Sequence, residues 1–203
     1  MPKKHAAIGV QMHSGWGVLI AVSSADSLEL LDRRRIVVVD PAMPGGKQPY
    51  HHARLLLDGQ NLAVAERYLE EYAAACEQMA TFAIKEAVLG VRSQGYRIVG
   101  TAILQGAGRP LPPLAQILAA HPLIHTAEGE FFCRAARIAC ERLKIPVTGI
   151  RRRDLDERAK ISFGKRANQL KRNIANLGKP LGPPWTADHK DAVLAAVTIL
   201  AGG

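Results

Sequence analysis

Two carboxylates in the expected last helix and two amides at strand ends are the residues whose spacing could do chemistry. Asp188 and Asp191 stand three residues apart, so a helix would place both on one face. Gln11 ends the first apolar run, and Gln105 follows a later one. Converging carboxylates can hold Mg²⁺ or Mn²⁺ for phosphodiester hydrolysis, whereas neutral amides are weaker ligands. We therefore expect these four residues to form a catalytic set in which Asp188 and Asp191 bind an ion weakly.

Each member of this set also has a purely structural interpretation. Thr186 is an expected helix N-cap, and acidic residues in the turn that follows it would stabilise the helix dipole. Gln11 and Gln105 could hydrogen-bond a substrate or simply each other. The sequence leaves both interpretations open.

The elements that must position these residues follow from hydrophobic periodicity and turn residues. Strands are expected over 6–11, 18–22, 28–39, 96–104 and 145–150, and helices over 61–93, 113–120, 126–143, 152–176 (broken near Gly164) and from 185 onwards, with a Pro/Gly-rich loop over 40–58. Three meander strands followed by strand–helix alternation predict an α/β fold. We expect a mixed five-stranded sheet with antiparallel and then parallel strands, helices on both faces, and one domain over 1–203.

Three short motifs, in this order of elements, resemble the RuvC-type Holliday-junction resolvases. Residues 8–11 (Ile-Gly-Val-Gln) and 14–18 (Ser-Gly-Trp-Gly-Val) are similar to the family's first strand and following turn. Residues 188–192 (Asp-His-Lys-Asp-Ala) are similar to the Asp-x-x-Asp-Ala signature of its last helix. The resemblance implies a ribonuclease-H-like fold and a metal-dependent nuclease site. It also implies that a first-strand Asp falls on Gln11 and a fourth-strand Glu on Gln105, so we expect a degenerate or altered site with little or no nuclease activity.

The positive charge of the chain is concentrated in one segment. The formal net charge is +9, and residues 144–179 hold eleven Lys or Arg against three acids, a net of +8. Such a stretch is typical of a protein that binds a polyanion, here DNA or RNA, although a solvated basic helix face gives the same pattern. The expected nucleic-acid-binding residues are Arg151, Arg152, Arg153, Lys165, Arg166, Lys171 and Arg172.

The histidines show no metal-binding spacing along the chain. Pro122 lies between His121 and His125, which argues against a helical His-x-x-x-His pair, so a zinc site is not expected. Thr126 is instead the expected N-cap of the next helix, with acidic residues in its first turn. His13, His51, His52 and His189 are scattered elsewhere.

Two other functional classes stay open. A small phosphorylated ligand or a nucleotide could bind in the same strand-end cleft, with Gly-rich loops at 14–15 and 106–108 bringing backbone amides close to phosphate. Trp16 would then be either a stacking platform or a core residue. Alternatively, the chain is a non-catalytic interaction protein that kept the fold without the chemistry.

Composition excludes some classes and sets the expected compartment. The chain has 203 residues, 48% of them hydrophobic, and no apolar run of membrane-spanning length. Its start lacks the apolar stretch of a signal peptide, and its three cysteines form no Cys-x-x-Cys pair. We therefore expect a cytoplasmic protein with reduced thiols and no membrane partner; a homodimer is left open.

Overall fold

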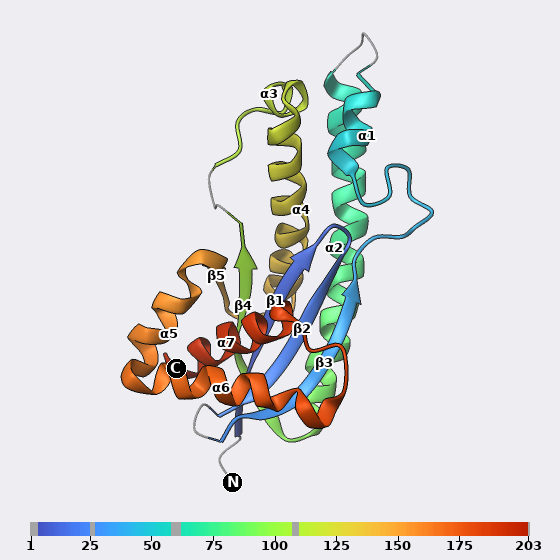
Figure 1. Cartoon of the computed structure of the whole chain (residues 1–203). Helices are drawn as coiled ribbons and strands as arrows, with labels where there is room; N and C mark the ends of the chain where they lie inside the picture. The colour runs from blue at the N-terminus through green and yellow to red at the C-terminus, as the bar shows by residue number, and fades with distance from the viewer. Residues whose placement is uncertain (1–3, 25–26, 58–61, 107–109, 203) are drawn as a thin grey trace.

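A five-stranded mixed sheet forms the centre of the molecule (Figure 1). The computed structural model describes residues 4–24, 27–57, 62–106 and 110–202. The strand order is β3-β2-β1-β4-β5, where β1 is Lys4–His13, β2 Trp16–Ser23, β3 Glu29–Val37, β4 Tyr96–Gln105 and β5 Val147–Arg151. The strands β1, β2 and β3 form an antiparallel meander, and β4 and β5 run parallel to β1. The predicted fold class and strand order along the chain are confirmed.

Helices cover both faces of the sheet (Figure 1). The long helices α2 (Leu62–Ser93) and α4 (His121–Arg142) pack on one face, while α7 (Ala187–Ala201) packs on the other beside α5 (Leu155–Phe163) and α6 (Ala167–Leu177). Alternate residues of β1 supply the two cores: Ile8 and Val10 face α2 and α4, and Ala7 faces α7. Odd-numbered residues of β1 therefore point toward the last helix.

The last helix lies against β1 at a position that only glycine permits. A Cβ on Gly9 would stand 1.9 Å from the carbonyl oxygen of Ala192. Without that side chain, the backbone of α7 can approach the strand closely. The contact fixes α7 along β1 and so sets where the carboxylates of its first turns lie.

The helices α2 and α4 project beyond the sheet, and two predictions for this projecting part are wrong. The stretch 40–58, expected to be a loop, contains the helix α1 (Pro49–Leu55), and α4 begins at His121 rather than near Thr126. Pro122 stands in the first turn of α4, where proline is tolerated because the first amides have no intrahelical acceptor. Thr126 is inside α4, and its hydroxyl donates to the carbonyl of Pro122 at 3.0 Å.

The remaining elements lie close to their predicted places. The short helix α3 (Leu114–Ala119) precedes α4, and three 3₁₀ turns, η1 (Arg152–Asp154), η2 (Gly164–Arg166) and η3 (Lys179–Leu181), join the C-terminal helices. The predicted break near Gly164 is confirmed, since Gly164 has a φ of +53° between α5 and α6. Cys76, Cys133 and Cys140 are buried free thiols. Among the described residues, the helices are all too short or too polar to cross a bilayer.

Candidate functional site

The first turn of α7 meets the carboxyl end of β1. Nε2 of His13, the last residue of β1, lies 3.1 Å from Oδ2 of Asp188. Four residues earlier in β1, Gly9 contacts Ala192 of the same helix. Gln11 stands between these two contacts and points to the same face of the sheet as both of them. The predicted meeting of the first strand with the last helix is therefore present in the structure.

Arg152 contacts both carboxylates of α7. Its Nε and an Nη atom each lie 2.8 Å from Oδ2 of Asp191, and the Nη2 atom lies 3.7 Å from Oδ1 of Asp188. Arg152 comes from η1, directly after β5, and half of its side chain is exposed. With His13 on its other side, Asp188 faces two basic side chains. The guanidinium of Arg152 thus lies at the two carboxylates that were expected to bind a metal ion.

Gln11 presents an unsatisfied oxygen at this place. Its Nε2 donates to the carbonyl of Met12 at 3.1 Å, which fixes the orientation of the amide. The Oε1 atom is buried and has no hydrogen-bond partner among the described residues. A buried carbonyl oxygen without a donor is costly, so this atom is a ready acceptor at the edge of the carboxylate pair.

Gln105 does not join this group. In the parallel pairing of β1 with β4, the partner of Gln11 is Leu104, whose side chain lies in the core on the α7 side. Gln105 therefore points to the other face, where its amide covers Gly149. We expected Gln105 to lie with Gln11, either as a second substrate contact or as its hydrogen-bond partner. The structure puts the two side chains on opposite faces of the sheet, because side chains alternate along a strand. The residue of β4 that faces the carboxylates is the apolar Leu104.

These residues do not fit a two-metal centre. Such a centre needs several charged oxygens to neutralise two divalent ions about 3.5–4 Å apart. Here the side chains are two carboxylates already paired with Arg152 and His13, one amide and one leucine. The buried, unpaired Oε1 of Gln11 leaves at most one additional neutral oxygen ligand.

Aromatic and basic side chains continue from His13 across the meander. The ring of His13 stacks on Trp16 at 4.4 Å between centroids, and the guanidinium of Arg35 lies 4.1 Å from the Trp16 ring centroid. Trp16 and Arg35 border a cavity of about 370 Å³ that reaches Asp188 and His189. Trp16 is only partly buried, so it packs against the core on the α7 side and still lines this cavity.

The structural role expected for Thr186 is present as well. The backbone N–H of Thr186 donates to Nδ1 of His189 at 3.3 Å, and the side chain of Thr186 accepts the backbone N–H of His189, which together form a capping box. The hydroxyl of Thr186 also lies 2.8 Å from Nδ1 of His189. Burial lowers the pKa of His189, with Arg33 acting in the same direction and Asp188 against it. His189 therefore holds the helix start, at the border of the cavity beside Trp16.

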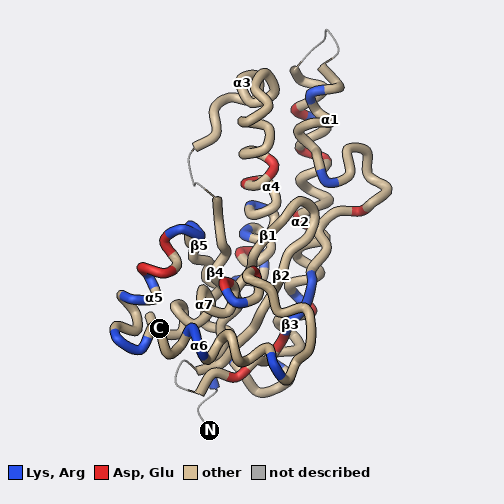
Figure 2. The backbone as a smooth tube through the Cα atoms, in the orientation of Figure 1, with Lys and Arg blue, Asp and Glu red and all other residues tan. Residues whose placement is uncertain are grey.

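The seven basic residues expected to form one surface follow the chain from the end of β5 to α6 (Figure 2). Arg151 ends β5 and Arg152 and Arg153 begin η1, beside the carboxylates, and Arg151 and Arg153 both contact Asp154. Lys165 and Arg166 belong to η2, at the far end of the nine residues of α5, which is about 13 Å of helix. The helix α6 then folds back along α5, so that Lys171 pairs at 2.6 Å with Asp156 in the first turn of α5, and Arg172 hydrogen-bonds Gln169. Lys165 and Arg166 therefore lie away from the strand-end arginines, whereas Lys171 returns toward them.

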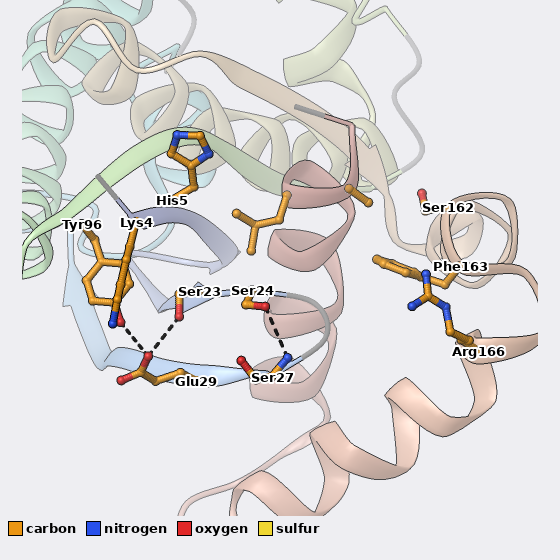
Figure 3. A pocket seen from close by; sticks show the side chains of 12 residues that line it. Lys4, His5, Ser23, Ser24, Ser27, Glu29, Tyr96, Ser162, Phe163 and Arg166 are labelled. Atoms are coloured by element: carbon orange, nitrogen blue, oxygen red, sulfur yellow. Dashed lines mark hydrogen bonds between the residues drawn. The ribbon is translucent and has the colours of Figure 1, made fainter. Parts of the chain in front are cut away.

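Arg166 borders a different cavity, at the amino ends of β1 and β4 (Figure 3). This cavity has a volume of about 640 Å³ and also contains Lys4 and His5. Its carboxylate, Glu29, accepts hydrogen bonds from Tyr96 at 2.6 Å and Ser23 at 3.2 Å, and the bond from Tyr96 is the main reason that its pKa is lowered. Because β1 separates the two places, this cavity is distinct from the carboxylate site.

Some relevant residues were not apparent from the sequence. Leu104 and the roles of His13 and Arg152 at the carboxylates depend on strand register and on the path of the chain after β5. The sequence could have indicated Leu104 only if the pairing of β4 with β1 had been known, because the register decides which residue of β4 shares a face with Gln11. The Gly-rich loop expected to approach phosphate falls mainly on 107–109, which lie outside the described residues; Gly106 is exposed.

The comparison with solved structures is the one that bears on the fold. No protein-family model and no curated protein sequence matches the chain. Among solved structures, RuvC of Thermus thermophilus in complex with a Holliday-junction substrate superposes with a TM-score of 0.52 at 13% identity, covering 96% of this chain and 91% of that one. A second Thermus thermophilus RuvC structure matches with a TM-score of 0.47, also at 13% identity. The chain therefore has the ribonuclease-H-like fold seen in RuvC.

Proposed function

We propose that this protein binds branched nucleic acid, DNA or RNA, at the carboxyl end of its sheet, with a degenerate centre in place of a two-metal nuclease site. The observation that carries the proposal is the contact of Arg152 with Asp191 and Asp188. A guanidinium there supplies internally the positive charge that divalent ions would supply in a nuclease. The RuvC that shares the fold is seen with a Holliday junction, which supports the choice of ligand.

The side chains around the carboxylates suit this ligand. Arg151 and Arg153 present exposed guanidiniums beside Arg152, and guanidiniums bind phosphate in a bidentate manner. Trp16, between His13 and Arg35, offers a ring on which an unpaired base at a junction can stack. The carboxylates of Asp188 and Asp191 would repel phosphate if unpaired, so the positive charge of Arg152, which offsets one of their two negative charges, favours binding.

Chemistry at this site is limited to binding and positioning. One Mg²⁺ or Mn²⁺ ion would bind weakly, because it must displace Arg152 from the carboxylates and finds only an amide at Gln11. Purified protein incubated with a four-way DNA junction and either ion should leave the strands intact. Strand cleavage that survives repurification and disappears in an Asp191→Asn variant would contradict this part of the proposal.

Salt-dependent binding tests the nucleic-acid part. Fluorescence anisotropy should show tighter binding to a four-way junction than to a duplex of equal length, with an affinity that falls steeply with salt. Two charge-matched triple variants locate the surface: Arg35→Glu, Arg151→Glu and Arg153→Glu at the strand ends, and Lys165→Glu, Lys171→Glu and Arg172→Glu on η2 and α6. The first should lose binding and flatten the salt slope by about one per phosphate contact removed.

The second triple variant is the control, and it should retain most of the binding. Loss of binding in the second variant alone would move the interface to α6. Absence of junction binding by the parent protein near physiological salt would overturn the proposal. It would favour the alternative that the chain is a non-catalytic interaction protein.

The cavity beside Trp16 favours a second candidate, a small phosphorylated ligand or nucleotide. Its volume of about 370 Å³ is within the usual range for ligand pockets, and Arg35 and Trp16 offer a cation and a ring. Calorimetric titration with ATP, ADP and inorganic phosphate tests it. A nucleotide that binds in the micromolar range while the junction does not would favour this candidate over the first.

A further inference from the structure

Three histidines meet at the projecting end of the long helices, where α1 packs on the start of α4 (Figure 1). His51 belongs to α1, and His121 and His125 belong to the first turns of α4. Each can offer one ring nitrogen such that the three atoms lie within 4.8 Å of one another. The ring centroids are 5.3 Å apart for His51 and His121, 5.0 Å for His51 and His125, and 4.4 Å for His121 and His125. Small side-chain rotations would bring all three nitrogens to one ion.

A buried carboxylate orients one of the three rings. Oε1 of Glu128 lies 2.9 Å from Nδ1 of His51 and also accepts the backbone N–H of His51 at 3.3 Å. Glu128 is 4% exposed, a degree of burial that is unusual for a glutamate without a specific partner. A carboxylate on Nδ1 places the proton there, so Nε2 of His51 carries the free lone pair. This arrangement is the usual outer-shell support of a metal-binding histidine.

The other two rings come from successive turns of one helix. Residues four apart lie on the same helix face, so His121 and His125 project together once α4 begins at His121. Pro122 does not interrupt this turn, because it stands at the start of the helix. Both rings are exposed, which leaves the outer side of the cluster open to water.

We infer that His51, His121 and His125 bind one divalent transition-metal ion of the zinc class, with Glu128 as the residue that positions His51. Imidazole nitrogen suits Zn²⁺, Co²⁺, Ni²⁺ and Cu²⁺, whereas Mg²⁺ prefers hard oxygen ligands. Three histidines and one water complete a tetrahedral Zn²⁺ shell. The histidine site should therefore prefer Zn²⁺ over Mg²⁺, whereas the oxygen ligands of the carboxylates near Gln11 suit Mg²⁺.

The ion would join α1 to the start of α4. The helix α1 has seven residues; it packs on α2 and α3 through a small apolar cluster around Ala53 and Leu118, and on α4 through Tyr50. A ligand from α1 and two from α4 would fix the stretch from β3 through α1 onto the projecting end of the long helices (Figure 1). The consequence expected of the ion is stability of this end, not a step at the strand-end site.

Metal binding to the full chain tests the inference. Protein freed of metal with a chelator should bind one Zn²⁺ per chain with a sub-micromolar dissociation constant in calorimetry, and Co²⁺ should give the intense visible bands of four-coordinate nitrogen ligation. Excess Mg²⁺ should not compete. Zn²⁺ should also raise the melting temperature, since an ion that binds only the folded state stabilises it.

Variants separate this site from adventitious binding. His121→Ala with His125→Ala removes two exposed rings without opening the core and should abolish the Co²⁺ bands and the Zn²⁺-dependent rise in melting temperature. Glu128→Gln should weaken Zn²⁺ binding by about 10–100-fold, the usual effect of removing outer-shell support. The matched control is His52→Gln, which changes the neighbouring histidine of α1 and should bind Zn²⁺ like the parent.

Two results would overturn the inference. Zn²⁺ binding that is equally tight in the His121→Ala, His125→Ala double variant would place the ion elsewhere. Absence of sub-micromolar binding in the parent, with the fold intact by circular dichroism, would show that the three rings are only neighbours. If the Glu128→Gln variant loses helicity, the His121→Ala, His125→Ala double variant alone decides whether the three histidines bind the ion.

Discussion

Arg152 donates to Asp191 at 2.8 Å across the gap between β5 and α7, from a position 39 residues earlier in the chain. Asp188, one turn before Asp191, lies between this guanidinium and the ring of His13. The carboxylate pair is therefore part of an internal ion-pair network that links three elements. Arg152 offsets one of the two negative charges from within the protein, and that offset decides how the site responds to metal and to phosphate.

Removing Arg152 should expose the carboxylates to metal. In an Arg152→Gln variant, Mn²⁺ affinity measured by calorimetry should rise about fivefold, which corresponds to about 1 kcal/mol, the value of a half-exposed ion pair. Arg153→Gln is the control, because Arg153 contacts Asp154 rather than α7. Equal Mn²⁺ affinity in both variants and the parent would show that Arg152 does not compete with the ion.

Restoring carboxylates should work at position 104 and not at 105. A Gln11→Asp, Leu104→Glu variant places two new carboxylates toward α7, and a Gln11→Asp, Gln105→Glu variant places only one there. Mn²⁺ should raise the melting temperature of the first variant more than that of the second. The first will be less stable without metal, since Leu104 is 1% exposed and a buried carboxylate is costly. The reverse order of the two metal effects would contradict the register argument.

Gly9 should be irreplaceable where α7 crosses β1. Gly9→Ala sets a methyl group 1.9 Å from the carbonyl of Ala192, so α7 must move away, at a cost of about 1–3 kcal/mol or more in unfolding free energy. Gly129→Ala is the matched control, because that exposed position of α4 has no atom near a new Cβ and should gain about 0.5–1 kcal/mol. Urea unfolding of both variants measures the difference. A Gly9→Ala protein as stable as the parent would rule out the close contact.

His189 should make stability depend on pH. Burial lowers the pKa of its ring below 6.5 in the folded state, so the unfolded chain takes up the proton first. Its contribution is complete above about pH 6.5 and is lost as the pH falls through that value toward the folded-state pKa. His189→Gln keeps a capping-box residue at this position but cannot titrate, so the variant should lose less stability than the parent between about pH 7.5 and 5.5.

Urea unfolding with a chelator present, repeated at several pH values, measures this slope. His5→Gln, a change at an exposed histidine at the opposite end of β1 from His13, is the control and should keep the slope of the parent. Parallel slopes for the parent and the His189→Gln variant would show that His189 does not contribute.

The sequence by itself determined the elements and their order. Apolar runs bounded by turns located the five strands, and helical spacing located α2, because burial on one face leaves a periodic trace in the chain. The Thr186 cap and the break at Gly164 were also readable, since a helix start and a positive φ demand particular residue types nearby. The meeting of the last helix with the end of β1 was implied by the resemblance to RuvC-type resolvases, and the contact of Asp188 with His13 agrees with it.

Tertiary structure decided which side chains share a face and a neighbourhood. Register, not proximity in sequence, put Leu104 rather than Gln105 toward the carboxylates, because one residue along a strand reverses the face. The return of the chain after β5 brought Arg152 onto Asp191, and the turn at Gly164 folded α6 back so that Lys171 contacts Asp156 in the first turn of α5. Docking of α1 on α4 joined His51 to two histidines some 70 residues away, around a glutamate whose partner no local pattern shows. Such contacts depend on packing between elements, and sequence spacing carries no record of that packing.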